Sequence, residues 1–172
     1  MKYHFSVIIP THNRQLALDR CLRSLKRQVY PPDRFEVIVV DDGSVHPVIL
    51  DSDLFADGFT VSVMRIANSG PGPARNAGAA VAKGQFLAFT DDDCQPDPLW
   101  LLELERQLSA DSCRIVGGKT HNMLTRNPMA GCAAEPMCSR ARTSLAPHPR
   151  ALCSRANPWL QRHKCAHAHA YR

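Results

Sequence analysis

Short apolar runs alternate along this chain with longer segments in which apolar residues recur every three or four positions. The runs are rich in β-branched residues, which is typical of strands buried on both faces of a sheet. They cover residues 5–9, which Pro10 ends, 35–40, 61–66 and 86–89, with Ile115 and Val116 as a short fifth run. We therefore expect five strands before about residue 117.

The segments between the runs predict helices. The first should begin at Asn13 as its N-cap, run until Pro31, and bury a stripe formed by Leu18, Cys21, Leu22, Leu25 and Val29. A second covers about residues 74–82, with Pro73 in its first turn. A third opens at Asp97 and Pro98 and carries Leu101, Leu104 and Leu108 on one face. Alternation of strands and helices with short connections predicts an α/β fold with a mostly parallel sheet flanked by helices.

The pattern stops at about residue 125. We expect residues 1–124 to form one domain and residues 125–172 to form an irregular tail rich in Cys, His and Pro. The formal charge of +5 belongs to this tail: residues 1–128 hold 14 basic and 15 acidic residues, whereas the last 44 hold seven basic residues and a single acid, Glu135. The basic charge is therefore no indication of an anionic partner for the domain.

The composition of the tail leads to two hypotheses. Residues 129–172 contain no Val, Ile or Phe, which is what a frameshifted or truncated remnant would show. The alternative is a zinc-binding or nucleic-acid-binding appendage that uses Cys153, His163, Cys165, His167 and His169. Their spacing matches no standard zinc template, and basic residues with few aromatic neighbours are a poor signature of nucleic-acid binding. We expect no nucleic-acid partner.

The apolar runs also bear on location. All of them are far shorter than the roughly 20 residues that cross a bilayer, so we expect no transmembrane segment and no secretory signal. An odd number of cysteines, seven, predicts reduced thiols. We expect a cytoplasmic protein that could associate peripherally with the inner face of the membrane.

Acidic residues follow two of the predicted strands. Asp41 and Asp42 end one, and Asp91, Asp92 and Asp93 end another. Ligands of parallel sheets bind at the carboxyl ends of strands, where a carboxylate pair would suit Mg²⁺ or Mn²⁺. The simpler alternatives are solvated acids in a turn for residues 91–93 and an Asx turn for Asp41 and Asp42. Arg75, early in the second helix, could face an anion or be an ordinary surface cation.

Four motifs in order resemble the N-terminal half of family 2 glycosyltransferases with the GT-A fold. They are Val-Ile-Ile-Pro-Thr-His-Asn-Arg at 7–14, Val-Ile-Val-Val-Asp-Asp-Gly-Ser at 37–44, Asn-Ser-Gly-Pro-Gly-Pro-Ala-Arg-Asn-Ala-Gly at 68–78 and Phe-Thr-Asp-Asp-Asp-Cys at 89–94. The resemblance covers about residues 5–124. It implies a Rossmann-like GT-A domain, here incomplete, and a nucleoside-diphosphate sugar as donor, with a UDP-sugar as the first expectation.

The resemblance also implies roles for individual residues. The expected nucleotide-binding set is Pro10, Thr11, Asn13, Arg14, Asp41, Asp42, Arg75, Asp91 and Asp92. Within it, the residues from the loop after the first strand would lie around the base and ribose, namely Pro10, Thr11, Asn13 and Arg14. Asp42 would contact the nucleoside. Asp91 and Asp93 match the outer positions of the Asp-x-Asp motif of the family and would hold Mn²⁺ or Mg²⁺, which would neutralise the diphosphate leaving group. Transfer by this family is typically inverting, which implies a hexosyltransferase-like enzyme with a glycan, a lipid or a small molecule as acceptor.

The general base that inverting transfer needs is not recognisable in this sequence. In the family an acid from the second half of the domain normally serves, and here Glu135 is the only acid after Asp111. The alternative function is therefore a truncated, non-catalytic fragment that binds a nucleotide sugar. A nucleotidyltransferase on a related fold is disfavoured, since the loop of residues 10–14 contains no glycine.

Overall fold

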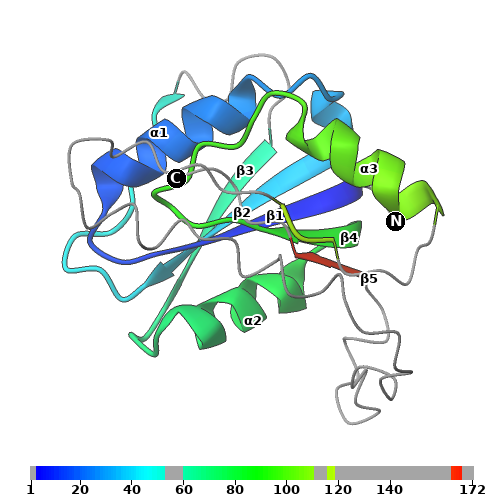
Figure 1. Ribbon diagram of the computed structural model, residues 1–172. Helices are drawn as coiled ribbons and strands as arrows, with labels where there is room; N and C mark the ends of the chain where they lie inside the picture. The colour runs from blue at the N-terminus through cyan, green and yellow to red at the C-terminus, as the bar shows by residue number, and fades with distance from the viewer. Residues whose placement is uncertain (1–2, 53–59, 111–115, 119–163, 168–172) are drawn as a thin grey trace, which may run out of the picture.

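The computed structural model describes residues 3–52, 60–110, 116–118 and 164–167 (Figure 1). In chain order the elements are β1 (Tyr3–Thr11), α1 (Gln15–Lys26), the short 3-10 helix η1 (Pro32–Arg34), β2 (Phe35–Asp42), β3 (Thr60–Ile66), α2 (Pro71–Val81), β4 (Gly84–Phe89), α3 (Trp100–Ala110) and β5 (Lys164–His167). None of the helices described is long and apolar enough to cross a membrane.

The strands form one sheet in the order β3-β2-β1-β4-β5, and every neighbouring pair is parallel. This confirms the predicted α/β fold with a parallel sheet. The chain first moves outward from β1 to β2 and β3, and then returns to place β4 on the other side of β1. The reversal leaves a crevice at the carboxyl ends of β1 and β4, which is where sheets of this kind bind ligands.

Helices cover both faces of the sheet (Figure 1). Successive strand residues point to opposite faces, so Phe5, Val7 and Ile9 pack with the buried leucines of α1 and α3, whereas Ile8 packs with the small residues of α2. The predicted stripes of α1 and α3 are confirmed at Leu18, Cys21, Leu22, Leu25, Leu101, Leu104 and Leu108, all buried. The two layers fix the ends of α1 and α2 beside the crevice.

The sequence predicted that Pro10 ends the first strand, and this is wrong. β1 continues through Pro10 to Thr11. The carbonyl of Ile8 accepts a hydrogen bond from the N–H of Thr90, so the backbone polar groups of Ile8 face β4. Backbone polar groups two residues apart in a strand face the same side, so those of Pro10 face β4 too. Pairing of β1 with β4 ends at Ile8 and Phe89. Pro10 lies beyond this last pair, so its missing N–H removes no hydrogen bond between β1 and β4.

The prediction that Asn13 caps α1 is wrong. Arg14 is the N-cap residue, and Asn13 has a left-handed backbone with a φ of 55°. The helix also ends at Lys26, before Val29, which is 60% exposed and whose N–H bonds to the carbonyl of Pro98. Helical spacing alone placed Val29 on the stripe, and this tertiary contact was invisible in the sequence.

The end of the domain differs from expectation too. Val116 is buried but lies in no strand, while Ile115 is outside the described residues. Instead Lys164–His167, within the segment expected to be irregular, pairs with β4 as β5. The domain boundary at residues 124–125, together with Glu135 and most of the tail, lies outside the described residues, so the division into domain and tail stays a prediction.

Candidate functional site

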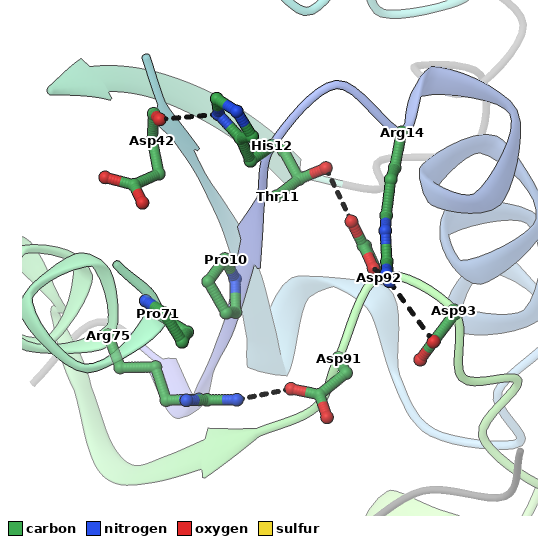
Figure 2. A pocket seen from close by; sticks show the side chains of 10 residues that line it. All are labelled: Pro10, Thr11, His12, Arg14, Asp42, Pro71, Arg75, Asp91, Asp92 and Asp93. Atoms are coloured by element: carbon green, nitrogen blue, oxygen red, sulfur yellow. Dashed lines mark hydrogen bonds and ion pairs between the residues drawn. The ribbon is translucent and has the colours of Figure 1, made fainter. Parts of the chain in front are cut away.

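A cavity of about 350 Å³ opens at the carboxyl ends of β1, β2 and β4, beside the N-terminus of α2 (Figure 2). The last residues of β1 and β2 line it, together with the segments that follow β1 and β4 and the first turns of α2. Its lining residues are Pro10, Thr11, His12, Arg14, Asp42, Pro71, Arg75, Asp91, Asp92 and Asp93. All the predicted site residues except Asn13 and Asp41 therefore line one cavity. Pro71 and His12 were missed by sequence reasoning.

Asn13 does not line the cavity but joins two loops beside it. Its N–H donates to Ser44 Oγ at 2.9 Å, and its Oδ1 accepts from the N–H of Val45 at 2.8 Å. Left-handed backbone is several-fold more frequent for Asn than for most residues, because its short side chain can bond locally. Asn13 thus ties the loop after β1 to the loop after β2 instead of starting the helix.

His12 has both ring nitrogens engaged in the cavity wall. Nδ1 lies 2.8 Å from the carbonyl oxygen of Asp42, which can only accept, so Nδ1 carries the proton. Nε2 then accepts from Asn13 Nδ2 at 2.8 Å, in agreement with the orientation that Val45 imposes on this amide. These two contacts fix the orientation of the ring. Its position inside the 10–14 motif was the only sequence signal that could have marked it.

Asp42 organises the turn that leads into α2. Its Oδ1 accepts from the N–H of Ser69 and its Oδ2 from the N–H of Gly70, both at 2.8 Å. Gly70 has a φ of +94°, a conformation in which a side chain would be strained. The Asp42 carboxylate therefore fixes the start of α2, and with it Arg75, while still lining the cavity.

Asp41 is brought next to the site but does not line it. Its side chain is 1% exposed, its Oδ1 accepts from the N–H of Ser44 at 2.9 Å, and its Oδ2 lies 3.7 Å from Arg65 Nε. Burial alone would raise the pKa of this carboxyl, but the bonds from Ser44 and the charge of Arg65 outweigh burial and hold the pKa below its usual value. Asp41 is a charged support beneath the loop.

Asp92 is the buried member of the acidic triplet. Thr11 Oγ1 donates to its Oδ2 at 2.8 Å, and Arg14 Nη1 lies 3.3 Å from its Oδ1. Burial raises the pKa of the Asp92 carboxyl, against the lowering effects of Thr11 and Arg14. Its contacts tie the ends of β1 and β4 together. They place its neighbours Asp91 and Asp93 at the cavity.

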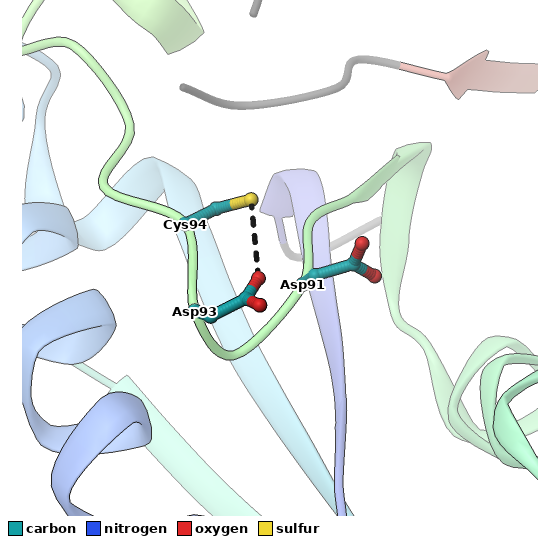
Figure 3. A group of neighbouring side chains, drawn as sticks. All are labelled: Asp91, Asp93 and Cys94. Carbon is teal, nitrogen blue, oxygen red and sulfur yellow. Dashed lines mark hydrogen bonds between the residues drawn. The ribbon is translucent and has the colours of Figure 1, made fainter. Parts of the chain in front are cut away.

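Asp91, Asp93 and Cys94 form the group most suited to a cation within the described residues, since one ligand atom from each lies within 4.8 Å of the others (Figure 3). The chain is not extended here: a turn closed by the N–H of Cys94 on the carbonyl of Asp91, at 3.1 Å, brings the two aspartates together. Burial raises the pKa of the Cys94 thiol to about 11. The charged donors are carboxylate oxygens, which fit Mg²⁺ or Mn²⁺.

Two arginines pair with these aspartates. Arg75 of α2 donates to Asp91 Oδ1, and Arg14 Nη1 lies 3.3 Å from Asp93 Oδ2 (Figure 2). Both guanidinium groups reach the acidic turn from opposite sides, Arg14 from the end of β1 and Arg75 from α2. The cavity therefore combines carboxylates for a cation with cations for a phosphate.

Comparison with known proteins agrees with this geometry. The family described as Glycosyl transferase family 2 matches residues 6–126, so the chain belongs to that family. It is 34% identical over 132 residues to the glycosyltransferase AglE of Haloferax volcanii, covering 76% of this chain and 42% of the relative. It is 35% identical over 91 residues to the poly(ribitol-phosphate) beta-N-acetylglucosaminyltransferase TarS of Staphylococcus aureus, covering 52% of this chain and 16% of TarS. The chain thus spans less than half the length of these relatives.

Solved structures show the same fold. The crystal structure of S. aureus TarS 1-349 in complex with UDP-GlcNAc matches with a TM-score of 0.61 and 30% identity, over 72% of this chain and 36% of that one. A mannosyltransferase from Pyrobaculum calidifontis matches with a TM-score of 0.60 at 22% identity, over 71% of this chain and 36% of that one, which supports the fold alone.

Proposed function

We propose that this domain binds a UDP-sugar together with Mn²⁺ or Mg²⁺, and that it is the donor-binding part of an inverting glycosyltransferase. The observation that carries the proposal is the single cavity in which Asp42, Arg75, Asp91 and Asp93 meet at the carboxyl edge of the sheet. Similarity to TarS, whose structure was solved with UDP-GlcNAc, supports a uridine diphosphate as the nucleotide.

The cavity offers separate places for the two halves of a nucleotide. Pro10, Thr11, His12 and Asp42 form the wall on the β1 and β2 side, which we assign to the base and ribose. A carboxylate has about four acceptor positions, and Asp42 uses two for the N–H groups of Ser69 and Gly70, so acceptor capacity remains for a ribose hydroxyl. Asn13 and Asp41 would support this wall from behind without touching the nucleotide.

We assign the diphosphate to the opposite wall, between Arg75 and the Asp91–Asp93 turn. A divalent cation held by Asp91 and Asp93 would offset the negative charge that develops on the leaving diphosphate. Arg75 would add a charge-assisted hydrogen bond to the same phosphates. Asp92 would keep the turn in place through Thr11, since its own carboxylate faces into the protein.

Transfer also needs an acceptor and a base that removes its proton. No general base is recognisable in the sequence, and Glu135, the only acid after Asp111, lies outside the described residues. The second candidate function is a donor-binding chain without transfer activity, favoured by the observation that the acids lining the cavity, Asp42 and Asp91–Asp93, are all assigned to the nucleotide, the cation or the support of the turn. The acceptor, the cytoplasmic location and any association with a membrane stay predictions from the sequence.

Calorimetry with UDP, with and without Mn²⁺, tests the proposed binding. We expect binding that requires the cation and that weakens at least tenfold in Asp93→Asn, because one carboxylate ligand is lost. Asp33→Asn is the matched control: Asp33 is exposed in η1, next to the amino end of β2, and loses the same charge. Equal UDP binding by the two variants would refute the assignment of Asp93.

Hydrolysis of UDP-GlcNAc by the chain separates the two candidate functions. Release of UDP that depends on Mn²⁺ and on Asp93 supports an active transferase. Cation-dependent UDP binding without release of product supports the donor-binding chain. Absence of UDP binding contradicts both.

A further inference from the structure

Arg14 pairs with two carboxylates of the acidic turn. Its Nη1 lies 3.3 Å from Asp92 Oδ1 and 3.3 Å from Asp93 Oδ2, so one nitrogen bridges two carboxylates of the acidic turn. Asp93 is also one of the two aspartates whose oxygens converge on the candidate cation site. A cation at Asp93 and the present contact of Arg14 therefore compete for the same carboxylate.

We propose that Arg14 competes with the metal for the acidic turn. While no cation is bound, Arg14 neutralises Asp92 and Asp93. When the cation and the donor bind, the Arg14 guanidinium moves to the donor diphosphate. This inference rests on the proposed function, and it changes the role that the resemblance implied for Arg14, which was contact with the base and ribose. Arg14 is a positioning residue here, because it acts through the carboxylates and the phosphates of the donor.

Arg14 is built to move in a way that Arg75 is not. Its backbone is anchored, since the Arg14 carbonyl accepts hydrogen bonds from the N–H groups of Ala17 and Leu18, both at 3.0 Å. Its side chain is 58% exposed, whereas that of Arg75 is 31% exposed. The guanidinium of Arg14 can therefore change partner within the cavity without disturbing α1.

Electrostatics gives the direction of the effect. The turn carries three carboxylates, and Arg14 and Arg75 offset most of their charge. A divalent cation entering while Arg14 stays in place feels the repulsion of a unit positive charge a few ångströms away, twice that between two univalent ions. Donor phosphates relieve this repulsion by giving Arg14 a new anionic partner. Binding of metal and donor should therefore be coupled, each increasing the affinity for the other.

Calorimetric titration of the full chain with Mn²⁺ alone tests the competition without any measurement of activity. Arg14→Gln should bind Mn²⁺ on the order of tenfold more tightly than the parent chain, because the competing cation is gone. In saturating Mn²⁺ the same variant should bind UDP roughly tenfold more weakly, because a charge-assisted hydrogen bond to the phosphates is lost. The two changes have opposite signs, which simple damage to the site would not produce.

Two further variants complete the test. Arg23→Gln is the matched control, since Arg23 also lies on α1, is 61% exposed and pairs with a single carboxylate, Asp51, at 2.8 Å outside the cavity. It should leave both affinities unchanged. Arg14→Lys keeps the charge and should hold the Mn²⁺ affinity within about threefold of the parent, which also guards against misfolding of the glutamine variant.

Mn²⁺ affinity that does not rise in Arg14→Gln, or that rises equally in Arg23→Gln, would overturn the proposal. UDP affinity that is unchanged in Arg14→Gln would overturn it as well. In either case, Mn²⁺-dependent UDP binding by the parent chain would leave the proposed function standing. A parent chain that binds no UDP would refute both.

Discussion

Gly78 offers the sharpest test of how the fold positions the site. It lies in the buried face of α2, and a Cβ added there would come within 2.7 Å of Ile8 Cγ2 and 2.9 Å of Val40 Cγ2. Both methyl groups belong to buried β-branched side chains of β1 and β2, which have little rotamer freedom. Gly78→Ala must therefore push α2 away from the sheet.

The magnitude follows from two opposing effects. Overpacking of a tight core costs about 1–3 kcal/mol, whereas replacing glycine by alanine inside a helix gains up to about 1 kcal/mol. Gly72→Ala is the comparison variant, because Gly72 lies in the same helix and an added Cβ there would meet nothing within 4 Å beyond its chain neighbours and the backbone of the helix itself. We expect Gly78→Ala to be less stable than Gly72→Ala by about 1–3 kcal/mol.

Urea unfolding of both variants measures this difference in stability. Calorimetry with UDP and Mn²⁺ measures the effect of each substitution on UDP binding. Arg75 precedes Gly78 by one turn of α2, so displacement of the helix should loosen its pairing with Asp91 and weaken UDP binding in Gly78→Ala but not in Gly72→Ala. Equal unfolding free energies of the two variants would refute the close approach of α2 to the sheet.

Two other predictions concern the strands. Gly84→Ala should destabilise the chain by at least about 2 kcal/mol in urea unfolding, because its Cβ would lie 2.5 Å from the backbone nitrogen of Ser6, and an unchanged unfolding free energy would contradict this packing. The pKa of Asp41 is lower in the folded chain than in the unfolded chain, where it is about 4. The charged Asp41 therefore stabilises the folded chain at pH values above about 4, and this contribution is lost as the pH falls through the lower, folded pKa. The stability advantage of the parent chain over Asp41→Asn should therefore shrink on acidification, and an advantage that stays constant from pH 7 to pH 2 would count against this explanation.

The sequence was informative wherever local pattern and topology agree. Apolar runs located β1 to β4, and parallel pairing then brings the residues that follow each strand to one edge. For this reason Asp42 and Asp93, distant in sequence, could be expected at one cavity. The structure brings most of the expected residues to one cavity, because most of their motifs follow strands directly, and their roles stay predictions.

Other features depend on contacts that no local pattern carries. Asn13 was expected to cap α1, yet bonds from Ser44 and Val45 hold it in a left-handed conformation. Asp41 and Asp42 look equivalent in sequence, and the alternation of a strand turns one toward Ser44 and Arg65 and the other toward the cavity. The strand Lys164–His167 contains no apolar run that could have predicted it. It pairs with β4 through backbone hydrogen bonds, which require no apolar pattern.

A crystal structure of this chain grown with UDP and Mn²⁺, with anomalous diffraction recorded for manganese, tests the central claim most directly. We predict one strong manganese peak between the carboxylates of Asp91 and Asp93, with the diphosphate beside it and Arg75 within hydrogen-bonding distance of a phosphate oxygen. A manganese peak elsewhere on the chain, or a nucleotide bound away from the carboxyl edge of β1 and β4, would contradict the account.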